Sequence, residues 1–392
     1  MSTGLVVVLA VSAGVPLLLG LLPAVRLPGA LLEIVVGVLI GPSVLGWVTP
    51  DATVQAFALL GLSFLLFLAG SEVDLRRFRG TLGRRVAVSL VISLVAAACV
   101  GGVLVALGVG GAVVIGVALL ATSLGLVVPV LADAGALGRP IGRIAIAGAS
   151  AGEVAAVVLL SVGLAESDTP LAGRLLLLVL LLAGLAAIGL AVAGVEHSMP
   201  LTALVGRLAD TSAQIRVRWT VLLVAGLALA AQALGFEAIL GAFLAGMLVR
   251  ALDPDPERTH PLYPVKLDAV GYGLLVPVFF VTSGLTLDLH GLVEHPAALA
   301  TVPAFLLALL VVRGLPALAF RRELAGRELS ALALLQATSL PFLIAATAIG
   351  REMGLLDPAV AAGLVAAGLA SVLVFPAVAV ALLSRITEPV PS

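Results

Sequence analysis

Long apolar stretches, separated by short polar segments, run through the whole chain. A stretch of about 17 to 25 mostly apolar residues is long enough to cross a bilayer as a helix, and this chain holds about thirteen of them. The expected spans lie near residues 4–24, 29–47, 53–71, 86–108, 111–133, 141–164, 171–195, 216–234, 236–251, 269–287, 296–320, 328–350 and 357–384. The pattern therefore predicts an all-α, polytopic membrane protein.

The composition agrees with this class. Hydrophobic residues make up 61% of the chain and charged residues 11%, whereas a soluble domain carries about 25% charge. The longest polar stretches, 197–218 and 253–268, are loop-sized, so no soluble domain and no fused cytosolic regulatory domain is expected. The sequence has no glycine-rich phosphate loop, no basic-aromatic pattern and no histidine spacing typical of a metal site. We therefore expect no cofactor, no transition metal and no nucleic-acid partner.

The basic residues indicate an orientation. Of the 21 lysines and arginines, Arg313 lies well inside an expected span. When the few residues at each span end are counted with the adjoining segment, only Arg174 and Arg351 follow even-numbered spans. All others follow odd-numbered spans, and basic residues favour the cytoplasmic side. This asymmetry predicts an external amino terminus and a cytoplasmic carboxyl terminus.

The tetrapeptide Ala-Thr-Ser-Leu occurs twice inside apolar stretches, at 121–124 and 337–340, with Pro129 and Pro341 close behind. Hydroxyl residues beside a helix breaker free backbone groups that lipid cannot satisfy. Two such segments in matching positions are typical of the paired discontinuous helices of secondary transporters. We therefore predict that both helices are broken here.

Other segments repeat at offsets of 204 to 216 positions. Glu33–Gly37 matches Glu237–Gly241, and in Leu66–Asp74 and Phe279–Asp288 an aspartate follows a glycine by four residues. The halves are spans 1–6, about 4–164, and spans 8–13, about 216–384, with span 7, about 171–195, as a linker. Because the offset of seven spans is odd, matching segments run in opposite directions. A six-plus-six inverted repeat with crossed discontinuous helices and alternating access is expected.

Glu153 and Arg313 each stand alone in a long apolar stretch of an expected span. A charge at the middle of a membrane helix costs about 2.5 to 3.5 kcal/mol, so such residues usually pair or line a wet cavity. Exclusion of water disfavours a charged carboxylate, so a proton and a hard cation can compete for its oxygens. Glu153 is expected to bind both, and a purely structural Glu153–Arg313 ion pair is the alternative.

Polar residues at and beside the two breaks complete the expected ion and proton site. They are Ser150, Thr122, Ser123, Thr338 and Ser339, with Arg313 as the charge partner. Glu33, at the start of the second span, either lines a funnel to the site or has a structural interfacial role. Gln232 and Gln336 are candidates for hydrogen bonds between helices.

Four stretches together resemble one transporter family. They are Leu27 to Gly46 with Gly41-Pro42-Ser43, Leu66 to Gly70 with Glu72 and Asp74, Gly241 to Gly246, and Pro277 to Gly284. The chain resembles the monovalent cation:proton antiporters, which include bacterial sodium/proton and potassium/proton exchangers. The resemblance implies a homodimer in the bacterial cytoplasmic membrane. It also implies a mobile core near 86–164 and 296–384, and a dimerisation scaffold near 4–71 and 216–287.

Gly152-Glu153 departs from the pattern of that family. Its members usually carry two acids, or Asn or Gln followed by Asp, at these positions, whereas here only Glu153 is acidic. The glycine leaves space into which the longer side chain of Glu153 is expected to extend. Arg313 resembles the basic partner that electrogenic members carry on the same span. With one acid, we expect exchange of one Na⁺ or K⁺ for one proton, without net charge movement.

Two other functions fit the same sequence features. A transporter of the same fold could carry another solute, such as an organic anion coupled to sodium, and a membrane sensor would transport nothing. The expected spans hold no nucleophile–base or metal arrangement, which argues against an enzyme.

Overall fold

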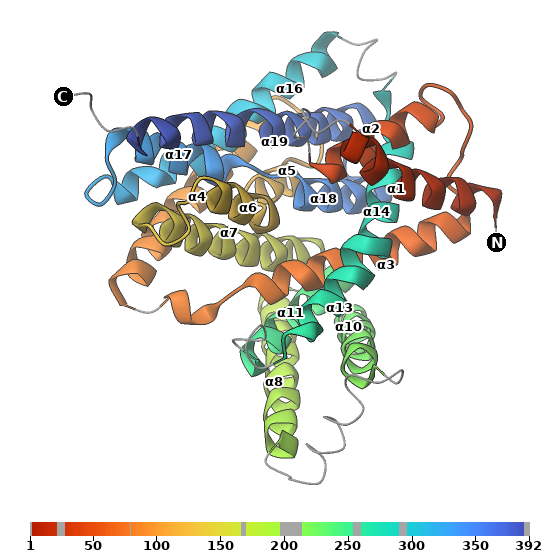
Figure 1. The fold of residues 1–392 in the computed structure, drawn as a ribbon, viewed down its shortest axis with the longest axis horizontal. Helices are drawn as coiled ribbons and strands as arrows, with labels where there is room; N and C mark the ends of the chain where they lie inside the picture. The colour runs from red at the N-terminus through yellow and green to blue at the C-terminus, as the bar shows by residue number, and fades with distance from the viewer. Residues whose placement is uncertain are drawn as a thin grey trace. The chain divides into compact units, whose positions relative to one another are not determined.

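The computed structural model describes residues 2–21, 28–78, 80–165, 170–196, 214–253, 260–289 and 296–387. Every regular element in these ranges is a helix (Figure 1). The α-helices are α1 (Thr3–Leu21), α2 (Gly29–Ile40), α3 (Ala52–Glu72), α4 (Gly80–Ala106), α5 (Ala112–Ala118), α6 (Leu124–Asp133), α7 (Pro140–Leu164), α8 (Leu171–Glu196), α10 (Ile215–Ala233), α11 (Ala238–Leu252), α13 (Leu262–Val270), α14 (Val276–Leu285), α16 (Pro296–Leu309), α17 (Gly326–Ala337), α18 (Pro341–Glu352) and α19 (Pro358–Thr387).

The predicted all-α membrane class is confirmed. Within the described ranges, 10 helical segments are long and apolar enough to cross a membrane, α17 and α18 counting together as one. Three shorter apolar helices, α2, α6 and α11, lie where the second, fifth and ninth spans were expected. The count of thirteen spans and the orientation of the termini stay predictions.

Both helices that carry the repeated tetrapeptide are broken at it, as predicted. The chain leaves α5 at Ala118 and enters α6 at Leu124, and it leaves α17 at Ala337 and enters α18 at Pro341. The N–H of Ser123 donates to the carbonyl of Thr338 at 3.0 Å, so the two irregular segments contact each other directly. A backbone group that leaves its own helix finds a partner in the other break, which is what a lipid environment requires.

The two prolines have different roles. Pro341 occupies the first turn of α18, where its fixed φ favours a helix start and its missing N–H removes nothing. Pro129 lies inside α6, which continues through it. Pro129 therefore lies behind the break and does not form it. A single proline near a helix start removes only one backbone hydrogen bond, which here does not end the helix.

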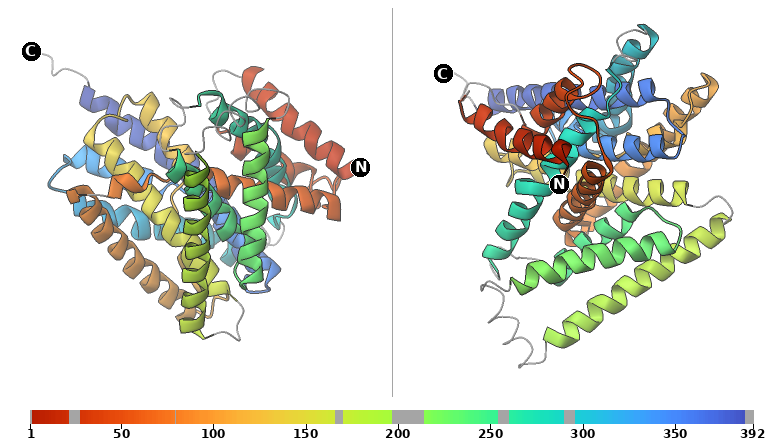
Figure 2. Two further views of the ribbon diagram at one scale, coloured as in Figure 1. Left: turned by 90° about the horizontal axis from the view of Figure 1, so that it is seen from below. Right: turned by 90° about the vertical axis from the view of Figure 1, so that its right-hand side faces the viewer.

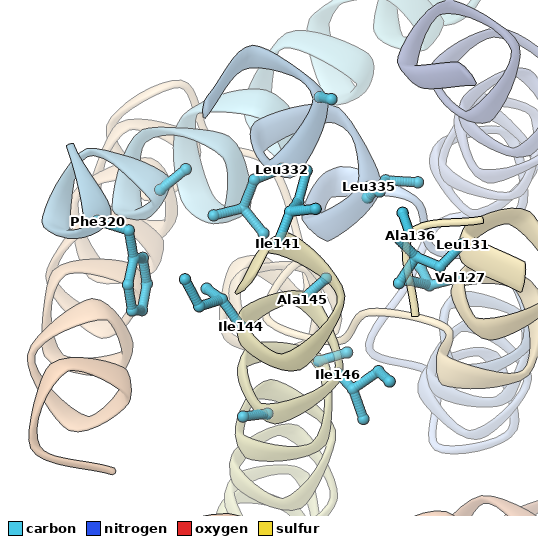
Figure 3. Packing of buried hydrophobic residues seen from close by; sticks show 14 of the residues in the cluster. Val127, Leu131, Ala136, Ile141, Ile144, Ala145, Ile146, Phe320, Leu332 and Leu335 are labelled. Carbon is cyan, nitrogen blue, oxygen red and sulfur yellow. The ribbon is translucent and has the colours of Figure 1, made fainter. Parts of the chain in front are cut away.

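The chain divides into two compact units. The first comprises residues 1–55, 75–156 and 280–392, and its apolar core surrounds α7. Figure 3 shows Ile141 and Ile144 of α7 facing Leu332 of α17 and Phe320, and all four are buried. Between membrane helices such contacts stabilise through close van der Waals packing, because lipid tails are as apolar as the side chains themselves. The helix that carries Glu153 is therefore held from several sides.

The second unit comprises residues 56–74 and 157–279. Its core joins α3, α10 and α11 through small and aromatic side chains, and α10 packs along α11 (Figure 2). The rings of Phe64 and Phe67 lie 5.3 Å apart with an interplanar angle of 51°, a tilted arrangement that aromatic pairs favour. The separation into a mobile core and a dimerisation scaffold stays a prediction.

Each unit contains a close contact between the two sequence halves that glycines of the repeated motifs make. In the first unit, a Cβ on Gly37 of α2 would lie 2.2 Å from the carbonyl oxygen of Val281, and one on Gly284 of α14 would lie 2.2 Å from that of Ile34. In the second unit, a Cβ on Gly70 of α3 would lie 2.1 Å from the carbonyl oxygen of Phe243 in α11. Small residues allow such backbone approach in membrane proteins. Each contact joins a helix of the first sequence half to one of the second.

Candidate functional site

Arg313 lies in a π-helical segment, Leu310–Gly314, between α16 and a 3₁₀ turn, and only 1% of it is exposed. Pro316 follows two residues after this segment and lacks the N–H that would bond to Val312, so one hydrogen bond of a regular α-helix is missing at this point. Local π-helical turns insert an extra residue and often occur at functional sites. The sequence thus folds locally so that a cationic side chain enters the interior of the first unit.

All three guanidinium nitrogens of Arg313 donate hydrogen bonds to neutral oxygens. Nε donates to Thr122 Oγ1 at 2.9 Å. Nη1 donates to Ser93 Oγ in α4 at 3.2 Å, and Nη2 donates to the carbonyl of Gly148 in α7 at 2.7 Å. A hydrogen bond to a charged group contributes about 1.5 to 3 kcal/mol. Arg313 is therefore held at the first break by groups whose protonation does not change. We call Arg313 and these three acceptors the arginine cage.

Gly152 has no side chain because the guanidinium occupies that place. A Cβ on Gly152 would lie 2.6 Å from Arg313 Nη2, 2.7 Å from Cζ and 2.6 Å from the carbonyl oxygen of Leu120. Real side chains do not approach so closely, so any larger residue would displace Arg313 or the backbone. The space beside Glu153, into which this glutamate was expected to extend, is thus filled by Arg313.

Glu153 follows Gly152 in α7 and is 6% exposed, in the same unit as the arginine cage. Its carboxylate and the Arg313 guanidinium interact electrostatically. Ser150, one turn earlier in α7, is 1% exposed, and its hydroxyl has no hydrogen-bond partner in the described part of the chain. The structure therefore places both predicted charges in one water-excluded interior.

The hydroxyl residues of the two breaks differ in what they contact. Thr122 donates to the carbonyl of Gln336 at 2.5 Å while it accepts from Arg313. Thr338 donates back to Leu334 in its own helix at 3.0 Å. Ser123 joins the breaks through its backbone, and Ser339 is buried at 1% exposure. Of the predicted hydroxyl ligands, Thr122 is thus in direct contact with Arg313, and the approach of the others to Glu153 stays a prediction.

Four residues of this region were not predicted as parts of the site. Ser93 and Gly148 hold Arg313, and Ser371 of α19 accepts from the N–H of Ser339 at 3.2 Å and donates to its carbonyl at 3.0 Å. Gln336 was expected only to join helices. One signal was available: Gly148 and Gly152 are four residues apart, the spacing that leaves one helix face open to close approach.

Glu33 lies on α2, one turn before Gly37, and is 6% exposed. The three acceptors of Arg313 lie outside α2, so these hydrogen bonds do not connect Glu33 to the site. Both interpretations of Glu33, as part of a funnel and as a structural interfacial residue, stay predictions.

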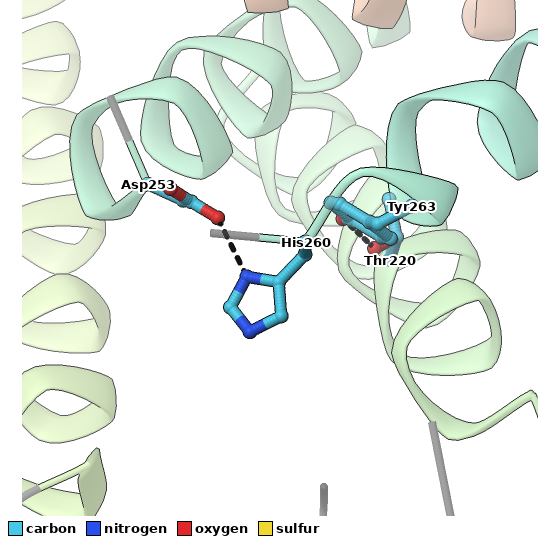
Figure 4. A network of polar contacts seen from close by, with 4 residues as sticks. All are labelled: Thr220, Asp253, His260 and Tyr263. Atoms are coloured by element: carbon cyan, nitrogen blue, oxygen red, sulfur yellow. Dashed lines mark hydrogen bonds and ion pairs between the residues drawn. The ribbon is translucent and has the colours of Figure 1, made fainter. Parts of the chain in front are cut away.

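The second unit contains a separate polar network (Figure 4). His260 Nδ1 lies 3.0 Å from Asp253 Oδ2, and the Tyr263 and Thr220 hydroxyls are 2.6 Å apart. In the described ranges, no three His, Cys, Asp or Glu residues are grouped so that they could hold a metal ion.

Comparison with known proteins gives the family. A profile described as "Sodium/hydrogen exchanger, transmembrane" matches residues 7–385. The chain is 30% identical over 367 residues to YjbQ of Bacillus subtilis, whose name marks it as a candidate Na⁺/H⁺ antiporter; the match covers 89% of this chain and 58% of that protein. It is 28% identical over 274 residues to the Na⁺/H⁺-K⁺ antiporter GerN of Bacillus cereus, covering 68% of this chain and 67% of the relative.

The fold has a counterpart among solved structures. The sodium proton antiporter MjNhaP1 from Methanocaldococcus jannaschii matches with a TM-score of 0.64 and 16% identity, over 98% of this chain and 99% of that one. The fold and the family expected from the sequence are thereby confirmed. The chain belongs to the sodium/hydrogen exchanger family.

Proposed function

We propose that this protein is a secondary active transporter that exchanges a monovalent cation, Na⁺ or K⁺, for protons by alternating access. The observation that carries the proposal is the buried carboxylate of Glu153 beside the arginine cage at two contacting helix breaks. Family membership supports it, as do relatives named as Na⁺/H⁺ and Na⁺/H⁺-K⁺ antiporters.

Glu153 is the group that carries either ligand. Its carboxylate oxygens bind a dehydrated cation or a proton but not both, so the occupant on the outward path differs from the one on the return path. Arg313 stays charged and in place in both states because its three acceptors are neutral. One cation for one proton then leaves the net charge of the site unchanged, and the exchange is electroneutral.

Alternating access requires two bodies that move relative to each other. We assign the moving body to a core near 86–164 and 296–384 and the fixed body to a scaffold near 4–71 and 216–287. The scaffold joins two copies in a homodimer. The protein resides in the bacterial cytoplasmic membrane with its amino terminus outside and its carboxyl terminus inside.

Transport of an organic anion on the same fold would need a cationic side chain open to the solute. Arg313 is the buried cation of this region, and its three nitrogens already donate to protein oxygens. This arrangement favours the cation substrate over the anion.

Glu153→Gln tests the proposal because glutamine keeps the shape of the side chain but neither titrates nor carries charge. In proteoliposomes with a proton-sensitive dye, the variant should show no Na⁺- or K⁺-driven proton movement, whereas the parent responds to one of these cations. Glu328→Gln, which removes a carboxylate that pairs with Arg139 at 2.5 Å, is the control and should exchange normally. Undiminished exchange by Glu153→Gln would exclude this glutamate as the carrier.

Electroneutrality has its own readout in the same vesicles. Moving one net charge per cycle would couple the rate to the membrane potential by about 2.3 kcal/mol per 100 mV. We expect the parent rate to be the same with and without an imposed potential. A rate that follows the potential would contradict the one-for-one stoichiometry and leave the role of Glu153 standing.

A further inference from the structure

A hydrogen bond joins the end of α18 to the end of α14. Arg351, in the last turn of α18, donates from Nη1 to the backbone carbonyl of Thr286 at 2.7 Å, and Thr286 directly follows α14. The last carbonyls of a helix have no partner within the helix and carry a partial negative charge, so a cationic donor stabilises this end. Both residues belong to the first unit. In the proposed transport cycle they belong to different bodies, because Arg351 lies in the core range and Thr286 in the scaffold range.

The Thr286 side of this contact is anchored to α2. Ser43, three residues beyond the end of α2, donates from Oγ to the carbonyl of Leu287 at 2.7 Å. A Cβ on Gly41 would lie 3.1 Å from Cα of Leu285, which continues the close glycine contact between α2 and α14. Backbones packed this closely have little room to slide past each other. The end of α14 is therefore expected to move together with α2.

The Arg351 side of the contact is anchored to the two helix breaks. Pro341 starts α18 directly after the second break, and Arg351 lies ten residues later, about 15 Å along the helix axis at 1.5 Å per residue. α18 packs against α5, the helix that leads into the first break. A Cβ on Gly111, directly before α5, would lie 2.8 Å from the carbonyl oxygen of Leu355, which follows α18. α5 and α18 thus form one body that carries both breaks, and Arg351 lies at its far end.

We propose that the hydrogen bond between Arg351 and Thr286 is a latch that stabilises one of the two access states. Thr286 lies at the end of the tenth expected span and Arg351 just after the twelfth, so the proposed orientation puts the latch on the external side. While it is closed, the body that carries the breaks is held against α14 at that side, and the ion site opens to the cytoplasm. The latch opens before the site faces outwards. This inference rests on the proposed exchange function.

The strength of the latch suits a contact that opens in every cycle. Thr286 is exposed and Arg351 is half-buried, so water and salt screen the charge. Exposed contacts of this kind are far weaker than the buried bonds of the arginine cage, and their loss shifts an equilibrium by about threefold. The latch therefore biases the two access states without trapping either of them.

Arg351→Ala tests the latch because it removes the donor. Exchange is measured in right-side-out and in inverted membrane vesicles, which present opposite faces of the protein to the added cation. The apparent affinity at each face follows the fraction of protein that is open to it. We expect the KM at the external face to fall and the KM at the cytoplasmic face to rise, so that the ratio of external to cytoplasmic KM decreases about threefold.

Arg139→Ala is the matched control. Arg139 pairs with Glu328 at 2.5 Å, and both residues lie in the proposed core, so this substitution removes an arginine contact that does not join two bodies. Its KM ratio should equal that of the parent. An unchanged ratio in Arg351→Ala would overturn the inference. So would KM values that change in the same direction at both faces, since loss of a merely structural contact would not favour one face.

A cross-link at the same place gives a second test, which decides the matter if Arg351→Ala fails to assemble. The double variant Thr286→Cys, Arg351→Cys is made with Cys99→Ala, which removes the native thiol. A reducible bifunctional thiol reagent should join the two cysteines and stop exchange, and a reductant should restore it. The pair Arg139→Cys, Glu328→Cys, linked within the proposed core, should exchange normally.

Two results of the cross-linking experiment would overturn the latch. One is continued exchange by the linked protein, and the other is failure of the two introduced cysteines to cross-link. Either result would leave the proposed function intact as long as Glu153→Gln abolishes exchange. Absence of cation-driven proton movement in the parent would instead contradict the proposed function itself.

Discussion

The two helix breaks have the same four residues but different surroundings. At the first, the hydroxyl of Thr122 donates to the backbone carbonyl of Gln336 and accepts from Arg313 Nε. At the second, the corresponding Thr338 bonds back to Leu334 in the helix it has just left. The repeated tetrapeptide therefore fixes where each helix stops, whereas the neighbouring helices decide which break holds the charge.

Different helices stabilise each break. The first depends on the arginine cage, which draws on α4, α7 and the π-helical segment Leu310–Gly314. The second depends on Ser371 of α19, which bonds to both the N–H and the carbonyl of Ser339, and on Pro341, which starts α18. Charged hydrogen bonds are roughly twice as strong as neutral ones. Substitutions at the first break should therefore lower the free energy of unfolding more than equivalent substitutions at the second.

Gly152→Ala should have the largest effect. The new methyl group would overlap both the Arg313 guanidinium and the carbonyl oxygen of Leu120, and the backbone atom has no way to swing aside. Overpacking of a buried site costs about 1 to 3 kcal/mol. We expect a lower melting temperature in detergent and exchange reduced more than tenfold in proteoliposomes.

Gly163→Ala is the matched control for this variant. It adds the same methyl group to the same helix, where no heavy atom lies within 4 Å of the new Cβ. It should exchange normally. If Arg313 is the group displaced, Gly152→Ala should cost less in an Arg313→Ala background than in the parent. If Gly152→Ala lowers stability equally in both backgrounds, the new methyl group does not displace the Arg313 guanidinium.

Thr122→Val against Thr338→Val compares the breaks directly. Valine keeps the shape of threonine, but at 122 it leaves Arg313 Nε without its acceptor and the Gln336 carbonyl without its donor. The expected loss in free energy of unfolding is about 2 to 3 kcal/mol at 122 and under about 1 kcal/mol at 338. Thermal unfolding in detergent measures both. Equal losses would mean that the two breaks are energetically equivalent despite their different contacts.

Ser371→Ala should have a smaller effect than Gly152→Ala or Thr122→Val. It removes the acceptor of the Ser339 N–H and a hydroxyl proton that the carbonyls of Ser339 and Gly368 share, but it touches no charge. A loss of about 1 to 2 kcal/mol is expected, with exchange by the folded protein unchanged. Stability and flux are therefore measured on the same preparation. If the variant has normal stability but no exchange activity, Ser371 has a direct role in transport besides stabilising the second break.

Local features of the sequence predicted the breaks and the interior positions of Glu153 and Arg313. Two hydroxyl-rich interruptions and two isolated charges are visible without a structure because lipid makes them costly. The arginine cage was not predictable in the same way. Ser93 and Gly148 carry no such signal, because their role depends on how α4 and α7 are rotated about their axes.

Pro129 shows how little a single proline determines. A proline in an apolar stretch indicates a break, but at this position in α6 the helix tolerates it, and the break lies before the helix starts. Proline lowers the probability of helix continuation without fixing where the chain becomes irregular. The different hydrogen-bond partners of Thr122 and Thr338 were likewise not predictable, because the two tetrapeptides are identical in sequence.

The glycine contact between α2 and α14 has a consequence for synthesis of the protein. Gly37 and Gly284, which meet there, are separated by 247 positions along the chain (284 minus 37). At about 5 to 20 residues per second, the ribosome needs roughly 12 to 50 s to pass from one to the other. During that interval Gly37 has no contact with α14, and the first unit cannot close. The contact of Gly70 in α3 can form earlier, because its partner α11 ends at Leu252, before α14 begins.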